Sequence, residues 1–196
     1  MAASSHEFCA LFLCMLLAAG CNKGSGEGSA VGQVWAPDCG LNGEPFSLDP
    51  NFFAMQPSAS VEIIDIVVQH GSDLQSFTDG ISIFIRDPRM VKESMLGADI
   101  DLRGIGFGSA VEMTLFLNAT CPGLAHLPVV YGAVSGTIRF EELYVPWMHN
   151  ATKETVAVFT NVEFIDNKDP DERRAVLEGD FRFLFERGLP TQYFQY

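Results

Sequence analysis

An acidic loop near the end of the chain carries the residues best suited to metal binding. Residues 166–172 read DNKDPDE, so that Asn167, Asp169 and Asp171 alternate like calcium ligands. Glu178 falls where an EF-hand loop places its bidentate glutamate. The first ligand is Asn where that loop has Asp, its central glycine is missing, and strand-like patterns flank the segment. We therefore interpret it as a solvated hairpin loop and keep a metal site on these four residues as the alternative.

Other side chains that could do chemistry are scattered along the chain. After the first 20 residues the histidines are His70, His126 and His149, with neither HxH nor HExxH spacing. Zinc sites usually have closely spaced ligands, and the chain contains no Gly-x-Ser-x-Gly nucleophile elbow. We therefore expect no enzymatic activity and no cofactor, and a binding or structural module is favoured.

Two loops have the character of a ligand site. Residues 145–152, VPWMHNAT, contain Trp147, and an aromatic side chain in a loop can serve as a ligand platform. Alternatively, Trp147 folds back and covers the end of the domain. Residues 69–80 form a connection that is long for a hairpin, and such loops are functional or mobile. A carbohydrate or small-ligand domain that uses strand-end loops, with Trp147 as anchor, is therefore the alternative function.

The amino-terminal segment predicts export. Residues 8–19 read FCALFLCMLLAA, an apolar run of about 12 residues, which is too short for a helix to span a bilayer of roughly 30 Å. It has the length of the hydrophobic region of a signal peptide. Small residues follow it and lead directly to Cys21, in the sequence LAAGC over residues 17–21.

This LAAGC segment resembles the lipobox of bacterial lipoprotein precursors. The resemblance implies cleavage between Gly20 and Cys21, a diacylglycerol on the Cys21 thiol, and acylation of the new amino group. Several acyl chains give stable anchoring in a membrane. Because Asn22, and not Asp, follows the cysteine, the common sorting rule of these lipoproteins implies the outer membrane of the cell envelope. The alternative is an ordinary signal peptide and a secreted soluble protein.

Composition divides the chain into three expected parts. Residues 1–20 are the signal peptide. Residues 22–32, NKGSGEGSAVG, are rich in Gly and Ser, so residues 21–33 are predicted to form a lipid-anchored flexible linker. Residues 34–196 then form one domain, as their length suggests.

Charge narrows the choice of partners. The formal net charge of −13 argues against a nucleic-acid partner, because binding phosphates requires clustered Lys and Arg. The expected partners are the membrane, through the lipid anchor, and a protein or carbohydrate of unknown identity.

The cysteine count predicts one disulfide. Cys9 and Cys14 leave with the signal peptide and Cys21 takes lipid, so only Cys39 and Cys121 remain in an oxidising compartment. Their pairing would close a loop of about 80 residues, which the chain-entropy relation values at roughly 4 to 5 kcal/mol. Two buried free thiols are the alternative.

Strand patterns dominate the remainder of the chain. Alternating or β-branched residues predict strands over residues 61–68, 81–86, 111–117, 129–133, 135–144, 155–165 and 175–186. In the last strand, Phe181, Phe183 and Phe185 are expected to face the core. One helix is predicted over residues 88–96, capped by Asp87. The set predicts an all-β fold, an antiparallel β-sandwich or jelly roll with one short helix, and a small closed β-barrel is the alternative.

Overall fold

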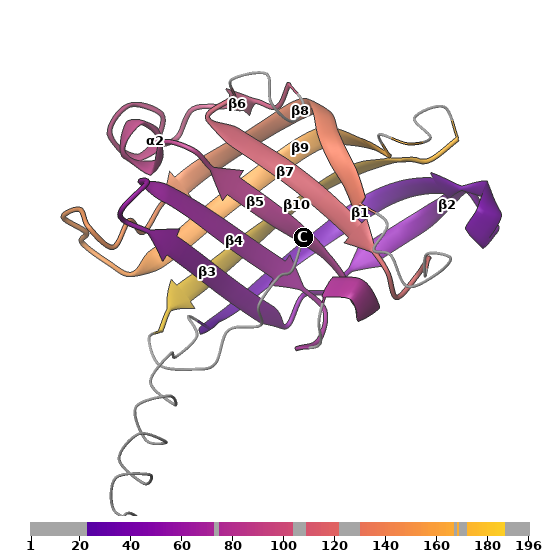
Figure 1. Cartoon of the computed structure of the whole chain (residues 1–196), viewed down its shortest axis with the longest axis horizontal. Coiled ribbons are helices and arrows are strands. Elements are labelled where there is room, and N and C mark those ends of the chain that lie inside the picture. The colour runs from indigo at the N-terminus through magenta and orange to yellow at the C-terminus, as the bar shows by residue number, and fades with distance from the viewer. Residues whose placement is uncertain are drawn as a thin grey trace, which may run out of the picture.

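The computed structural model describes residues 23–72, 75–103, 109–121, 130–166, 168 and 172–186 (Figure 1). Within these ranges the fold is all-β with a single short α-helix, as the sequence predicts. The strands are β1 (Lys23–Ala36), β2 (Leu41–Leu48), β3 (Phe52–Ser58), β4 (Ile63–Gln69), β5 (Asp79–Ile85), β6 (Ile100–Asp101), β7 (Val111–Leu117), β8 (Val130–Glu142), β9 (Glu154–Asp166) and β10 (Arg174–Phe185). The helix is α2 (Pro88–Ser94), and the 3₁₀ turns are η2 (Pro37–Cys39) and η3 (Gln75–Phe77). No helix in these ranges combines the length and apolar character needed to cross a membrane.

The sheet closes on itself and forms a barrel. From β3 to β10 each wall strand pairs antiparallel with the next wall strand along the chain, and β10 pairs back onto β1. β1 also pairs with β3, which completes a ring of eight strands, β1, β3, β4, β5, β7, β8, β9 and β10. The closed barrel is therefore found instead of two stacked sheets. One buried and one solvated face per strand suits both architectures, which is why alternation alone does not separate them.

The ring is paired unevenly around its circumference. β10 pairs with β1 along nearly the whole of both strands. β1 and β3 share only two residue pairs, Lys23–Ala54 and Gly24–Phe53, and the far half of β1 pairs with β2 instead. This contact between β1 and β3, which we call the seam, is the most weakly paired joint of the described barrel.

Strand β1 overturns the prediction of a flexible linker over residues 21–33. From Lys23 onward this Gly- and Ser-rich segment is a wall strand. Its glycines lie opposite the inward-facing phenylalanines of β10: Gly24 opposite Phe185, Gly26 opposite Phe183 and Gly28 opposite Phe181. A Cβ atom on Gly28 would come within 2.9 Å of the Phe181 Cβ. The glycines therefore reflect close packing against large side chains.

Apolar side chains fill the inside of the barrel. Phe181, Phe183 and Phe185 are each at most 2% exposed, which confirms the predicted inward face of β10. The Phe53 ring stacks on the Phe183 ring, with centroids 5.9 Å apart. The opposite side of the interior is aliphatic, with Ile64, Ile66, Ile81, Ile83, Ile85, Met113 and Leu115. Eight-stranded barrels are narrow enough for side chains to fill them, so a ligand is expected at the ends or outside.

Several predicted elements are confirmed with small shifts of their boundaries. β7 spans the predicted residues, and α2 begins after Asp87, whose carboxylate accepts a hydrogen bond from the Met90 N–H at 2.9 Å. β8 is one strand where two were predicted, because a register shift between Ala133 and Ser135 interrupts its alternation without ending it. β1, β2 and β3 were not predicted as strands.

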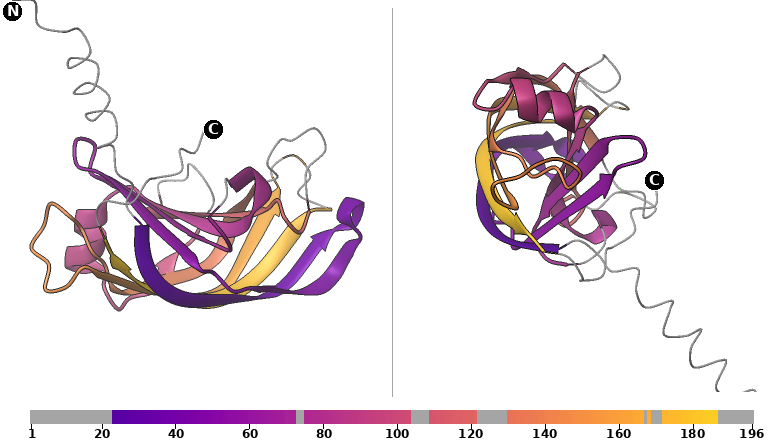
Figure 2. Two further views of the ribbon diagram at one scale, coloured as in Figure 1. Left: turned by 90° about the horizontal axis from the view of Figure 1, so that it is seen from below. Right: turned by 90° about the vertical axis from the view of Figure 1, so that its left-hand side faces the viewer.

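The long axis of the molecule separates two different ends. The end that carries α2 and the connection between β8 and β9, here called the α2 end, lies on the left of Figure 1 and faces the viewer on the right of Figure 2. The opposite end carries η2 and the tip of the β1–β2 hairpin, and is called the disulfide end. β1 begins beside the α2 end, since Gly24 pairs with Phe185, whose N–H donates to the Lys153 carbonyl.

Candidate functional site

The α2 end is closed by a network of hydrogen bonds. The Lys92 ammonium of α2 donates to the Leu143 carbonyl and to the Asn150 side-chain oxygen, both at 2.6 Å. The Asn150 amide donates to the carbonyls of Val145 and Met148, both at 2.7 Å. Burial lowers the pKa of Lys92. Asn150 therefore ties the connection to α2, and its polar atoms are engaged in holding the fold.

Trp147 belongs to this closed end. Its side chain is half-buried and packs against the core, as does that of its neighbour Met148. This is the covering arrangement, the second of the two arrangements considered for Trp147. A ligand platform would instead present the indole to solvent, so Trp147 is not the aromatic residue on which a binding site would be built.

The predicted disulfide is present at the other end. Cys39 of η2 and Cys121, after β7, are bonded, with their Cα atoms 5.5 Å apart. Arg173 lies nearby and forms ion pairs with Asp38 and with Asp166, the latter at 3.3 Å. The covalent link and these ion pairs join the β1–β2 hairpin to the connections that follow β7 and β9.

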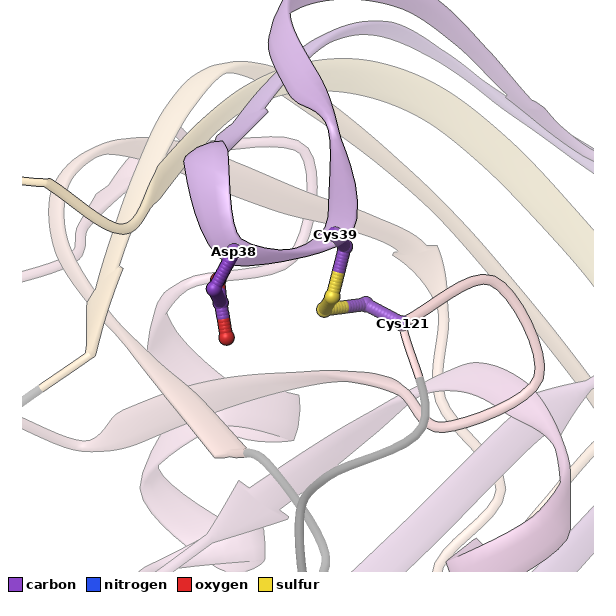
Figure 3. A group of neighbouring side chains, drawn as sticks. All are labelled: Asp38, Cys39 and Cys121. Carbon is purple, nitrogen blue, oxygen red and sulfur yellow. A yellow bond between two sulfur atoms is a disulfide. The ribbon is translucent and has the colours of Figure 1, made fainter.

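Asp38, Cys39 and Cys121 also form a compact group of possible metal ligands (Figure 3). Metals bind the thiolate form of cysteine. Figure 3 shows the two sulfur atoms joined to each other, so neither is a free thiolate. The Asp38 carboxylate is already paired with Arg173. The group is therefore a structural crosslink and not a metal centre.

Of the four weak candidates for metal ligands in and after the acidic hairpin between β9 and β10, the structure describes only Glu178. Asp166 accepts hydrogen bonds from the Lys168 N–H at 2.8 Å and from Arg173 at 3.3 Å. Glu178 is exposed on β10, four residues beyond Arg174 and thus roughly 13 Å along the strand. The other three candidates lie outside the described residues: Asn167, Asp169 and Asp171.

A groove of about 560 Å³ opens on the side of the barrel toward the disulfide end. It lies where the end of β2, the connection between β4 and β5, and the turn after β7 meet. We call it the end groove, and it is lined by Ser47, Leu48, Asp49, His70, Gly71, Phe77, Thr78, Asp79 and Ala119. The connection over residues 69–80, which the sequence marks as long, therefore supplies a large part of its wall.

Local hydrogen bonds hold the walls of the end groove in place. The Asp79 carboxylate accepts from the N–H groups of Ala119 and Thr120, at 2.9 and 3.1 Å, and from the Thr120 hydroxyl at 2.6 Å. The Asn51 side chain accepts from the Gly71 N–H at 2.7 Å, and Gly71 adopts a positive φ of 84°. Glycine suits this left-handed turn because it lacks a Cβ. The three segments are thus fixed to one another.

The end groove offers one exposed aromatic face beside several polar groups. Phe77 is 62% exposed, and Asp49 and His70 are exposed next to it. His70 Nδ1 lies 2.8 Å from the Asp49 carbonyl oxygen. Because a carbonyl only accepts, Nδ1 carries the hydrogen and Nε2 of the neutral ring is an acceptor. The groove therefore combines apolar contact with donors and acceptors, a composition typical of binding sites.

The arrangement in the end groove does not suggest acid–base catalysis. His70 is oriented by a main-chain carbonyl, whereas a catalytic base paired with a nucleophile is usually oriented by a third side chain. The Asp79 carboxylate is occupied by the turn at residues 119–120. The groove can hold a ligand, and its described side chains do not form a nucleophile–base pair.

Cys21, the predicted lipidation site, lies outside the described residues, two positions before the first residue of β1. Comparisons with protein-family models, with curated proteins and with solved structures each find no match to this chain. The functional assignment therefore rests on the residues themselves.

Sequence reasoning missed Phe77 and His70 as neighbours in one groove. The length of the connection over residues 69–80 was the available signal. Phe77 is the exposed aromatic of that connection, whereas Trp147, the aromatic chosen from the sequence, is half-buried at the other end.

Proposed function

We propose that this chain is an exported lipoprotein of the cell envelope, anchored by lipid on Cys21, whose barrel is a non-catalytic binding or structural module. The lipobox-like residues before Cys21 support the anchor. The Cys39–Cys121 disulfide carries the proposal of export, because stable disulfides form mainly in oxidising compartments outside the cytosol. The outer membrane follows from Asn22 by the sorting rule of such lipoproteins.

Mass spectrometry of the mature protein tests the anchor. The membrane fraction of cells that express the whole chain should yield an acylated peptide that begins at Cys21. The Cys21→Ser variant should be processed poorly and should lose the acylated peptide. A soluble protein with an unmodified amino terminus at another residue would contradict lipidation and favour an ordinary signal peptide with secretion.

The start of β1 at Lys23 determines how such an anchor would hold the barrel. Only Asn22 separates Cys21 from the wall strand, so no long spacer stands between lipid and fold. The neighbouring α2 end would lie close to the membrane. Ser47 pairs with Val31, eight residues along β1 from Lys23, so the end groove lies roughly 26 Å from the anchored end.

The end groove favours a carbohydrate or another small polar ligand as the second candidate function. Sugars present hydroxyl groups beside apolar ring faces, and the exposed ring of Phe77 lies beside Asp49, His70 and Ser47. An aromatic face is electron-rich and packs well against polarised C–H groups. In the proposed orientation, the groove also lies away from the end of the barrel that the lipid would anchor.

Isothermal titration with chitotriose, a soluble N-acetylglucosamine trimer, tests this second candidate. Binding should weaken at least tenfold in Phe77→Ala. Leu184→Ala is the matched control, because Leu184 is an apolar residue of β10 that is 46% exposed and lies outside the groove. Absent binding, or equal losses in both variants, would contradict recognition of this sugar at the groove and leave the anchored structural role.

A further inference from the structure

The segments that form the end groove contain neither Lys nor Arg. These segments are residues 41–51, 69–80 and 111–121. Two of the residues that line the groove, Asp49 and Asp79, are acidic. A concave site lined by charges of one sign raises the local concentration of ions of the opposite sign. The charge around the groove therefore favours a cationic ligand.

Neither of the two carboxylates forms an ion pair within the described part of the chain. The Asp79 carboxylate accepts its hydrogen bonds from the turn at residues 119–120. Those donors carry no charge, so they do not cancel the charge of the carboxylate. Asp49 is exposed, and no described salt bridge includes it. By contrast, Asp38 outside the groove is paired with Arg173. The end groove therefore presents uncompensated negative charge to a ligand.

The groove also matches the hydrogen-bonding pattern of an ammonium group. The Asp49 carboxylate and Nε2 of the neutral His70 ring accept hydrogen bonds and do not donate them. Phe77 is 62% exposed, and an aromatic ring attracts a cation that lies over its face. An ammonium group has three donors, a positive charge and no acceptor. It therefore complements the acceptors, the charge and the aromatic ring of the groove together.

We propose that the end groove selects a ligand that carries an ammonium group, an amino sugar or another small amine, over a neutral or anionic ligand of the same shape. The ammonium group lies against Phe77 and donates to Asp49 and His70. This inference rests on the proposed ligand-binding role of the groove and narrows its ligand to one with a free amine. A carboxylate or phosphate group would meet like charge there, with neither Lys nor Arg in the three segments to bind it.

Isothermal titration with two matched sugars tests this selection. Chitotriose carries neutral N-acetyl groups, whereas its deacetylated form, the glucosamine trimer, carries ammonium groups. The whole protein, in a nonionic detergent and with its disulfide intact, should bind the glucosamine trimer about fivefold more tightly than chitotriose at about pH 6. The ratio of the two affinities should fall toward one in about 0.5 M NaCl, because salt screens exposed charges.

Two substitutions separate a site in the groove from the general charge of the protein. Asp49→Asn removes the proposed anionic partner and should lower the ratio of the two affinities to less than about twofold. Glu44→Gln is the matched control and should keep the ratio, because Glu44 is an exposed acidic residue of β2 that does not line the groove. Equal falls in the two variants would show that the net charge of −13 attracts the cation without a site, and would contradict the proposal.

The possible outcomes distinguish this inference from sugar binding itself. Equal binding of the two trimers, or tighter binding of chitotriose, would contradict selection of a cation and leave carbohydrate recognition intact. If neither trimer binds, the carbohydrate candidate is wrong, and choline and its uncharged isostere 3,3-dimethylbutan-1-ol decide the inference. Choline should then shift the NMR signals of the Phe77 ring, which the spectrum of Phe77→Leu identifies, and the isostere should not. An equal response to the two compounds, or none, would overturn the proposal.

Discussion

The two ends of the barrel are stabilised by different means. At the α2 end, Lys92 and Asn150 hold the connection between β8 and β9 through hydrogen bonds, and Trp147 packs over the core. At the disulfide end, a covalent bond and the Arg173 ion pairs join the connections. A crosslink fixes loops without burying their side chains, so Phe77 and His70 can remain exposed in the nearby groove. Packed side chains therefore close the α2 end, whereas the disulfide end leaves open the groove for which a ligand is proposed.

Among the changes that test this contrast, loss of the disulfide should have the largest effect on stability. The Cys39→Ser/Cys121→Ser variant is expected to lower the free energy of unfolding by about 3 to 5 kcal/mol, because the crosslink restricts a long loop in the unfolded chain. Urea unfolding of the variant and of the oxidised parent measures this loss of free energy. A loss below about 1 kcal/mol would show that the Arg173 ion pairs suffice, although exposed pairs usually contribute less than that.

Substitution of one aromatic residue at each end should give the next largest difference in stability. Trp147→Ala is expected to cost about 2 kcal/mol, less than the loss for a fully buried aromatic, since Trp147 is half-buried. Phe77→Ala should change stability by less than about 0.5 kcal/mol, because Phe77 is mostly exposed. Thermal unfolding of both variants makes the comparison. Similar losses for the two would mean that the end groove is part of the packed structure and not a recognition surface.

The wall between the ends should carry a pH dependence of its own. The pKa of Asp65 is raised to about 6 in the folded protein, so between about pH 4 and pH 6 the folded state keeps a proton that the unfolded state loses. The free energy of unfolding should therefore fall as the pH rises from about 4 to about 6, by on the order of 1 to 3 kcal/mol.

Asp65→Asn isolates that contribution. The Ser82 hydroxyl donates a hydrogen bond to the Asp65 carboxylate at 2.7 Å, and the amide oxygen of the variant can still accept it. The variant should lack this fall and should gain most over the parent above pH 6. Denaturant unfolding from pH 4 to 7 gives both curves. Parallel curves would contradict the raised pKa of the Asp65 carboxyl in the folded protein.

Sequence reasoning identified the strands that alternate by themselves and missed those whose pattern depends on a partner. β10 was predicted because Phe181, Phe183 and Phe185 share one face and alternate with Arg182, Leu184 and Glu186 on the other. β1 was missed because three of its inward residues, Gly24, Gly26 and Gly28, are glycines that are explained only by the phenylalanines opposite them, more than 150 residues away along the chain. Pairing of that kind is invisible to any local window.

The candidate site also has one feature that the sequence predicts and another that it does not. The cysteine count was sufficient to predict the Cys39–Cys121 bond, because it needs no knowledge of geometry. The end groove is assembled from three separate segments, so its residues come together only when the barrel closes. Trp147 was selected as the candidate platform, and Phe77 was missed, because the sequence does not show which end of the barrel is packed.

The orientation of the two ends on the membrane is the most direct test of the account. A fluorescent donor is placed on Lys153→Cys at the α2 end or on Ser47→Cys in the end groove, and the acylated protein is reconstituted in vesicles that contain an acceptor lipid. Lys153 lies beside the end of β10, next to the start of β1, whereas Ser47 of β2 pairs with Val31, farther along β1. Energy transfer should be clearly stronger from residue 153 than from residue 47. Equal transfer, stronger transfer from residue 47, or failure of the protein to associate with vesicles would contradict an anchored α2 end and an outward-facing groove.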